Sequence, residues 1–312
     1  MLLQDAEELL RAESPELRPP DSDGLPGGLV YLDPWRPTVV VPDIHARMDF
    51  ILRVLSHRLV TLGREEQLLT LLFAGEAQLV CVGDYVHAEA RARERWLRAY
   101  QEYLGGYRDH AAMDEEMRES LGAVEILLEL KRALPGAVHL LKGNHENIAN
   151  EEGWGNHPFG KFADEGAMVA EYMERFYGAD LRDLFARVEH SYPLLTVGPH
   201  FLVSHAEPES FYPTGDVIEY RRNPELVAGL TWTPNDGAEE GSVERMLAHY
   251  IGSDTALHFG GHRPISGTYA LRAEGRYVQL HNPDAQIIAV IPVDRDISLS
   301  RDIVVLQGRE DL

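Results

Sequence analysis

The chain has 312 residues, and 29 Lys and Arg side chains against 51 Asp and Glu side chains give it a formal net charge of −22 at pH 7. Its hydrophobic content (44%) and charged content (26%) are ordinary for a soluble globular protein with a substantial core. The negative balance disfavours binding to nucleic-acid backbones and to anionic membranes, because both need a surface rich in Lys and Arg. A small anionic substrate would require a local positive charge, such as bound metal.

The N-terminal residues MLLQDAEELLRAE carry acids where a signal peptide has a basic region followed by an apolar run. No apolar stretch approaches the length that spans a membrane. The single cysteine, Cys81, excludes an internal disulfide and fits a reducing compartment. We therefore predict a cytoplasmic protein without a membrane partner.

Residues 1–37 begin with a short amphipathic helix pattern and continue with the Pro/Gly/Asp-rich segment ELRPPDSDGLPGG. We predict a surface arm here and one folded domain over residues 38–312. In that domain, apolar runs at 39–41, in QLVCVGD and in AVHLLKG predict buried strands. Helical spacing predicts helices over 49–62, 88–103, 113–134 and 161–190, with Pro135 and Gly136 ending the third.

The C-terminal part of the chain contains further strand patterns. YPLLTVG and HFLVSH predict paired strands with a turn at Gly198 and Pro199. Period-two alternation in TYALRAEGRYVQL, AQIIAVIPVD and DIVVLQ predicts antiparallel strands. Alternating strand-length and helix-length runs indicate a layered α/β domain.

Side chains that bind metals follow five of the strand-like runs. The residues concerned are Asp43, His45, Asp84, Asn144, His145, His205 and His262. The ends of strands are where α/β sheets place binding groups, so we expect these side chains to converge. Carboxylate and amide oxygens combined with imidazole suit Mn²⁺ first, with Fe or Zn²⁺ as alternatives. Two such cations would hold a phosphate and make hydroxide available near neutral pH.

These residues resemble the motifs of the calcineurin-like metallophosphoesterases, and within them the phosphoprotein-phosphatase-like (Ser/Thr phosphatase) branch. The matching segments, in the family's order, are PDIHAR, VGDYVH, KGNHEN, LVSHAEP and GGHRPI, with GLTWTPND similar to a short Trp segment of that branch. The resemblance implies an α/β fold in which two sheets form a sandwich flanked by helices, in four αββα layers. It implies that residues 38–312 form a metallophosphoesterase catalytic domain.

The resemblance also implies roles for individual residues. Asp43 and His45 would bind one divalent metal ion, and Asp84 would bridge two. Asn144, His205 and His262 would complete the second site. His145 would be the general acid, which protonates the leaving oxygen while metal-bound hydroxide attacks phosphorus.

The chain departs from the branch's Gly-Asp-x-x-Asp-Arg pattern, because His87 and Ala88 follow Asp84-Tyr85-Val86. The family's second Asp orients the general acid, and a neutral His87 could accept the same hydrogen bond. The family's Arg grips the phosphate. The candidate substitutes in this chain are Arg47, Arg91, Arg93 and Arg263.

Two side chains have simpler interpretations. Cys81 lies inside an apolar strand, so a buried core thiol is favoured over a reactive one. His281, in VQLHNPD, ends another strand, and a structural role is the default interpretation.

Three functions follow from these motifs. The first is metal-dependent hydrolysis of a phosphomonoester, with a phosphorylated small molecule or a phosphoprotein as substrate. The second is hydrolysis of a dinucleoside polyphosphate or another phosphodiester at the same centre. The third is a catalytically weak metal-binding scaffold, which the changes at His87 and Ala88 motivate.

Overall fold

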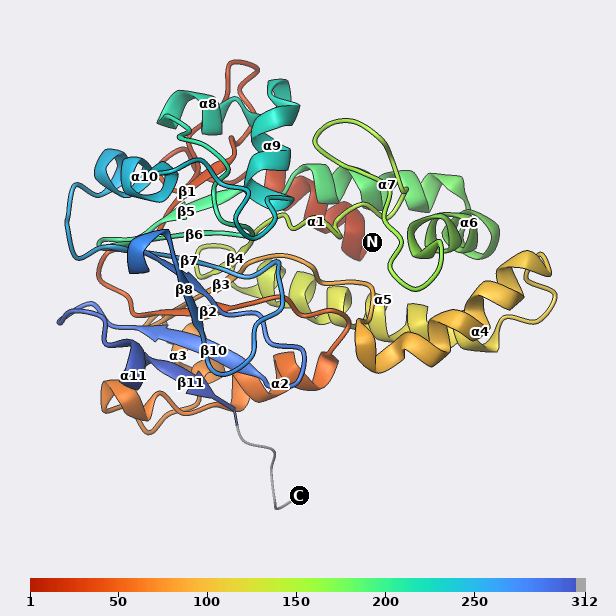
Figure 1. The fold of residues 1–312 in the computed structure, drawn as a ribbon, viewed down its shortest axis with the longest axis horizontal. Helices are drawn as coiled ribbons and strands as arrows, with labels where there is room; N and C mark the ends of the chain where they lie inside the picture. The colour runs from red at the N-terminus through yellow and green to blue at the C-terminus, as the bar shows by residue number, and fades with distance from the viewer. Residues whose placement is uncertain (307–312) are drawn as a thin grey trace.

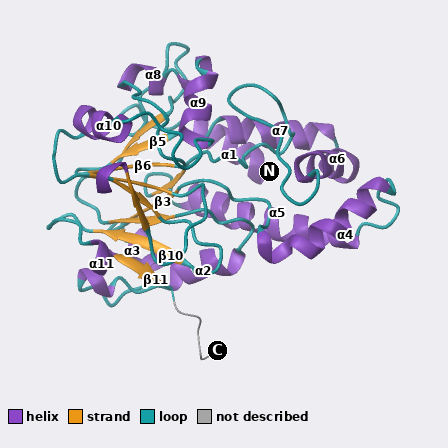
Figure 2. Cartoon of the chain, viewed as in Figure 1, coloured by secondary structure: helices purple, strands orange, loops and turns teal. Residues whose placement is uncertain are grey.

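Two β-sheets stack face to face in the computed structural model, which describes residues 1–306, and helices cover both outer faces (Figures 1 and 2). One sheet has the order β11 (Ile303–Val305), β10 (Ile287–Ile291), β2 (Thr38–Val41), β3 (Gln78–Cys81), β4 (Val138–Leu140). The other has the order β1 (Leu29–Tyr31), β5 (Leu195–Val197), β6 (Phe201–Ser204), β7 (Leu257–Gly260), β9 (Tyr277–Gln279), β8 (Ala270–Arg272). This arrangement confirms the predicted four-layer sandwich.

The run VVV at 39–41 illustrates why the strands are apolar on both faces. Val40 packs between the sheets in a cluster that includes Val80 and Phe259. Val39 and Val41 point the other way, into the core beneath the helices. A strand that is covered on both sides has no polar face, so its sequence is continuously hydrophobic.

Helices on the two sides of the sandwich belong to separate cores. The core beneath the five-stranded sheet includes residues of α1 (Leu2–Arg11), α2 (Met48–Ser56), α3 (Leu68–Phe73), α4 (Arg93–Leu104), α5 (Ala111–Ala133), α6 (Glu165–Tyr177) and α7 (Ala179–His190). The core over the six-stranded sheet includes residues of α8 (Thr214–Ile218), α9 (Pro224–Thr231) and α10 (Ser242–Tyr250). The short α11 (Leu299–Asp302) precedes β11, and single 3₁₀ turns occupy Val60–Leu62, Ala90–Ala92, Tyr220–Arg222 and Ala273–Gly275.

Most predicted elements are present with adjusted ends. The helix predicted over 161–190 is two helices, because Gly178 adopts φ +91° between α6 and α7. The helix predicted over 88–103 starts as a 3₁₀ turn and becomes α-helical at Arg93. β8 and β9 are antiparallel, as are β10 and β11, whereas β7 pairs in parallel with β6 and β9. The helix predicted over 49–62 ends at Ser56, and helices α3 and α8 to α11 were not predicted. None of the described helices is long and apolar enough to cross a membrane.

The N-terminal segment corrects the prediction of a surface arm. Ala6 and Leu10 of α1 are buried, and α1 packs against α5 and α7. Residues 29–31 then form β1, which pairs in parallel with β5 at the edge of the six-stranded sheet. The packing of this segment was not predicted, because its Pro/Gly-rich composition is typical of loops and a strand of only three residues leaves no clear pattern.

A buried ion cluster fixes this segment to the fold. The carboxylate of Glu13 accepts hydrogen bonds from Lys131 Nζ at 2.6 Å and from Arg18 Nη1 at 2.8 Å. Arg18 is fully buried and also donates to the main-chain carbonyls of Gly27 and Ser191. Burial raises the pKa of Glu13, but the two cations lower it further, so that it lies below its ordinary value of 4.5.

Replacing Glu13 with Gln is expected to lower the free energy of unfolding by roughly 3–5 kcal/mol at pH 7, because Lys131 and Arg18 keep their buried charges without a counter-ion. The folded-state pKa of Glu13 is depressed, so its stabilisation is complete well above pH 4.5 and disappears as the pH falls through the folded value. Urea unfolding at pH 7 and pH 3 checks this. An equal difference between variant and wild type at both pH values would contradict it.

Candidate metal centre and active site

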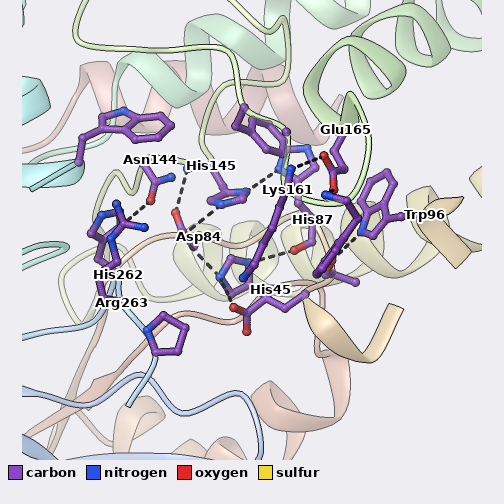
Figure 3. A pocket seen from close by; sticks show the side chains of 17 residues that line it. His45, Asp84, His87, Trp96, Asn144, His145, Lys161, Glu165, His262 and Arg263 are labelled. Carbon is purple, nitrogen blue, oxygen red and sulfur yellow. Dashed lines mark hydrogen bonds and ion pairs between the residues drawn. The ribbon is translucent and has the colours of Figure 1, made fainter. Parts of the chain in front are cut away.

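The side chains predicted from the sequence as metal ligands, and His145, the predicted general acid, converge beyond the ends of β2, β3, β4, β6 and β7. These residues are Asp43, His45, Asp84, Asn144, His145, His205 and His262, and all except the partly exposed His145 are buried. Figure 3 shows His45, Asp84 and Asn144 grouped along one wall of a cavity, with His145 beside Asp84. Both sheets contribute, because β2 to β4 belong to one sheet and β6 and β7 to the other.

Asp84 lies at the centre of the group. Its Oδ2 is 3.6 Å from His45 Nε2 on one side and 3.5 Å from His205 Nε2 on the other. Its Oδ1 accepts a hydrogen bond of 2.9 Å from the main-chain N–H of His145. One carboxylate oxygen is thus free to face two groups of nitrogen donors, which is the arrangement expected of a bridging ligand.

The imidazoles at this site present lone pairs to oxygen atoms. His45 Nδ1–H donates to the carbonyl of His87 at 2.9 Å, and His205 Nδ1–H donates to the carbonyl of Val82 at 3.1 Å. Burial lowers the pKa of both rings, so they are neutral and each Nε2 carries a lone pair. His205 Nε2 then meets Asn144 Oδ1 at 2.9 Å, although neither atom has a proton to share.

Other buried polar atoms around the site also lack a hydrogen-bond donor in the part of the chain that the structure describes. Buried Asp43 Oδ2, Asp84 Oδ2 and His262 Nε2 have no hydrogen-bond partner among the described residues. Buried polar atoms normally have partners, because leaving one unpaired costs about 1–3 kcal/mol. Carboxylate oxygens and imidazole nitrogens whose lone pairs face one another are the ligands that a divalent transition-metal cation binds. The residues present therefore fit a metal centre.

Electrostatics at Asp84 support the same fit. Burial, and next the neighbouring carboxylates of Asp43 and Glu146, raise the pKa of Asp84 well above its usual value. Without bound metal, the protein would hold these buried carboxylates close together only at a cost in folding free energy. Bound cations would remove that cost.

Local backbone strain and glycines place the ligands. His45, Asp84 and His262 adopt φ values of 45°, 54° and 66°, a region that non-glycine residues rarely enter. A Cβ on Gly261 would lie 2.0 Å from Asp43 Oδ1, and one on Gly143 would lie 2.3 Å from Asp84 Oδ1. The loops can approach the carboxylates this closely only because both positions are glycine.

Glu146 holds two of these loops together. Its Oε2 accepts hydrogen bonds from the main-chain N–H groups of Asp84 at 2.8 Å and Gly143 at 2.6 Å, and its Oε1 accepts from Tyr85 at 2.8 Å. Its side chain is buried. The sequence motif KGNHEN contains Glu146, but its positioning role was not predicted, since a charged side chain there could equally face solvent.

His87 lies directly beside the candidate general acid. Its Nδ1 is 3.2 Å from His145 Nδ1, and Phe159 packs against both rings. Burial, and next the His45 ring, lower the pKa of His87 to about 3, so His87 is neutral at physiological pH. A neutral His87 can accept the Nδ1–H of His145 and so orient that ring without repelling its proton.

A cavity of about 270 Å³ opens over these residues. Its wall includes His45, Asp84, Asn144, His145 and His262, together with the cations Lys161 and Arg263 (Figure 3). Arg263 was a candidate from the sequence, whereas Lys161 was not, because it lies in the loop after His157 and belongs to no motif.

The other arginines named from the sequence do not line this cavity. Arg47 donates to the main-chain carbonyls of Ile44 and Asp43 at 3.1 and 3.0 Å. Arg91 pairs with Glu119 at 2.8 Å, and the exposed Arg93 pairs with Glu94. Their guanidinium groups are committed to local partners, so of the four candidates Arg263 is the one that the fold brings to the cavity.

Cys81 is buried within β3, and burial raises the pKa of its thiol to about 12. It is therefore a core side chain, as expected. His281, by contrast, lies at the candidate metal ligands, with its Nδ1 atom 3.4 Å from Asp43 Oδ2. Glu89 lies there as well, with its Oε1 atom 3.6 Å from His45 Nε2. A structural role was expected for His281, and no role was predicted for Glu89.

Solved structures share the fold. No family model and no curated protein matches the sequence. A protein serine/threonine phosphatase from Saccharomyces cerevisiae aligns with a TM-score of 0.56 at 14% identity, over 100% of this chain and 89% of its own. A mutant cold-active protein tyrosine phosphatase aligns with a TM-score of 0.50 at 14% identity, over 96% of this chain and 84% of its own. These matches show that the chain shares its fold, two sheets flanked by helices, with these two phosphatases, as the motifs implied.

Proposed function

We propose that the protein is a metal-dependent phosphatase that hydrolyses phosphomonoesters. The observation that carries this proposal is the convergence of seven motif residues around buried acceptor atoms that lack hydrogen-bond partners, next to a cavity lined by the side chains of Arg263 and Lys161. Phosphate is a hard anion, and only a locally positive site would attract it to a protein of net charge −22.

The proposed ligands divide into two sets that share one carboxylate. Asp43, His45 and Asp84 would hold one ion, and Asp84, Asn144, His205 and His262 would hold the other; Mn²⁺ is our first choice for both. Two divalent cations supply charge neutralisation of the phosphate and a strongly acidified water. The alternating oxygen and imidazole donors suit Mn²⁺, and also Fe or Zn²⁺.

The chain's own residues would carry the proton and orient the substrate. His145 lies at the cavity wall, where it can donate a proton from Nε2 to the departing oxygen while its Nδ1–H is held by His87. Arg263 and Lys161 would bind the phosphate oxygens that do not react. Phe159 packs against the ring of His145.

Hydrolysis of p-nitrophenyl phosphate and of bis(p-nitrophenyl) phosphate, each with added Mn²⁺, tests the reaction type. We expect turnover of the monoester and little turnover of the diester, because a second bulky ester group has to fit into a cavity of only about 270 Å³. Preferred turnover of the diester would favour the dinucleoside polyphosphate or phosphodiester alternative. Absence of turnover from a protein that binds two metal ions would favour a scaffold.

Replacing Arg263 with Ala is expected to raise KM for p-nitrophenyl phosphate roughly tenfold, an effect of about 1.4 kcal/mol, with a smaller change in kcat. The reason is loss of a cation that lines the cavity. Arg93→Ala is the matched control, since Arg93 is exposed and pairs with Glu94 outside the cavity. Equal effects of the two substitutions would contradict a role for Arg263 in binding phosphate.

A further inference from the structure

His281 is a buried imidazole at the metal-binding residues for which the proposed function has no role. It follows β9, the strand of the six-stranded sheet that pairs with β7, and its side chain is fully buried. Its Nε2 is 3.1 Å from Glu89 Oε1, and its Nδ1 is 3.4 Å from Asp43 Oδ2. The ring therefore lies between two carboxylates.

The contact with Glu89 determines which nitrogen of His281 carries a proton. A carboxylate only accepts hydrogen bonds, so Nε2–H is the donor to Glu89. In the neutral ring, Nδ1 then presents a lone pair to Asp43 Oδ2. Both Nδ1 and Asp43 Oδ2 are buried and have no hydrogen-bond partner among residues 1–306.

The distance between these two atoms favours a shared metal over a shared proton. A charge-assisted N–H···O hydrogen bond measures about 2.7–2.9 Å, well short of the 3.4 Å observed. Two metal–ligand bonds of about 2.1 Å that meet at a tetrahedral angle span about 3.4 Å. His281 Nδ1 and Asp43 Oδ2 thus have the separation of two ligands of one ion.

A third candidate ligand, His45, and an arginine that connects two loops complete the arrangement. Single ligand atoms of Asp43, His45 and His281 all lie within 4.8 Å of one another. Arg47 donates to the carbonyls of Asp43 at 3.0 Å and Pro283 at 3.4 Å, and so connects the loop after β2 to the loop that carries His281.

We propose that His281 is a metal ligand, which binds through Nδ1 the same divalent cation as Asp43 and His45, and that Glu89 orients it through Nε2–H. Carboxylates commonly fix metal-binding histidines in this way. The proposal rests on the metal centre of the proposed function and extends its ligand set to the loop after β9, a further strand of the six-stranded sheet. Glu89 is a positioning residue, and it acts through His281.

Equilibrium dialysis of the metal-stripped full chain against Mn²⁺ tests this ligand set. We expect wild type to bind two ions and His281→Asn to lose at least about 100-fold in affinity for one of them. We expect Glu89→Gln to lose about 10–100-fold at the same site, the usual effect of removing a partner of a metal-binding histidine. His110→Asn is the matched control, because His110 is partly exposed and pairs with Asp114.

Co²⁺ provides a second measurement, since its visible absorption depends on the ligands. We expect His281→Asn to change the Co²⁺ spectrum and His110→Asn to leave it unaltered. Two sites of wild-type affinity and an unchanged spectrum in His281→Asn would overturn the proposal. If His281→Asn fails to fold, Mn²⁺ affinity and the Co²⁺ spectrum are measured on Glu89→Gln, which keeps the imidazole ring. Wild-type values of both in Glu89→Gln would then overturn the proposal. A wild-type protein that binds no Mn²⁺ would instead overturn the proposed function itself.

Discussion

Replacing Asp84 with Asn is expected to reduce Mn²⁺-dependent turnover of p-nitrophenyl phosphate roughly 10²–10³-fold or more. Asp84 Oδ2 is within 3.6 Å of nitrogen donors on both sides of the centre, so this one substitution weakens both proposed metal sites. An amide has a single oxygen and no charge, and it is a poor bridge between two cations. The measurement is kcat at saturating Mn²⁺, together with the number of ions bound.

The apo-protein separates this effect from misfolding. Burial, and next the carboxylates of Asp43 and Glu146, raise the pKa of Asp84, and Asn carries no charge to desolvate or to repel them. Without metal, Asp84→Asn should therefore unfold at the same urea concentration as wild type or a higher one. Asp254→Asn, at an exposed position, serves as control for the substitution itself. Wild-type turnover and metal content in Asp84→Asn would refute the bridging role.

Replacing His145 with Asn is expected to lower kcat about 10²–10⁴-fold for an alkyl phosphate, whose leaving oxygen needs a proton. The loss should be much smaller for p-nitrophenyl phosphate, because p-nitrophenolate leaves without protonation. Metal binding should persist, since His145 is not among the proposed ligands. A general acid is the one role at this site that predicts such a dependence on the leaving group.

Steady-state rates with both substrates, accompanied by metal analysis, measure this effect. His87→Asn is an informative companion, because it removes the acceptor at His145 Nδ1 but leaves the acid itself in place. It should give an intermediate loss with the same dependence on the leaving group. Equal losses on both substrates in His145→Asn would mean that His145 positions the phosphate or the metals and does not act as the acid.

The sequence predicted that these side chains converge, because its motifs place residue types that bind metals directly after apolar runs. Asp43, Asp84 and His205 each follow an apolar run that becomes a buried strand, and the carboxyl ends of neighbouring strands meet at one edge. The inter-sheet core was equally readable, since strands such as β2 are apolar on both faces.

Other parts depended on long-range packing that local patterns do not encode. β1 has only three residues and forms because β5 lies beside it, 166 positions further along the chain at Leu29 and Leu195. Glu89 lies in an Arg/Glu-rich segment and resembles a surface acid until the loop after β9 brings His281 to it. Arg47 and Arg91 were two of four candidates for contacting the phosphate, and the sequence alone does not indicate that local carbonyls and carboxylates occupy their guanidinium groups.

The number of Mn²⁺ ions bound per metal-stripped chain at equilibrium, determined by elemental analysis after dialysis, tests the central claim most directly. The buried oxygens of Asp43 and Asp84, and the Nε2 atom of His205 that faces Asn144 Oδ1, would gain partners if cations lay between them. We predict two ions per wild-type chain and a loss of both high-affinity sites in Asp84→Asn. A wild-type chain that retains no Mn²⁺, Fe or Zn²⁺ would contradict the metal centre and the phosphatase activity derived from it.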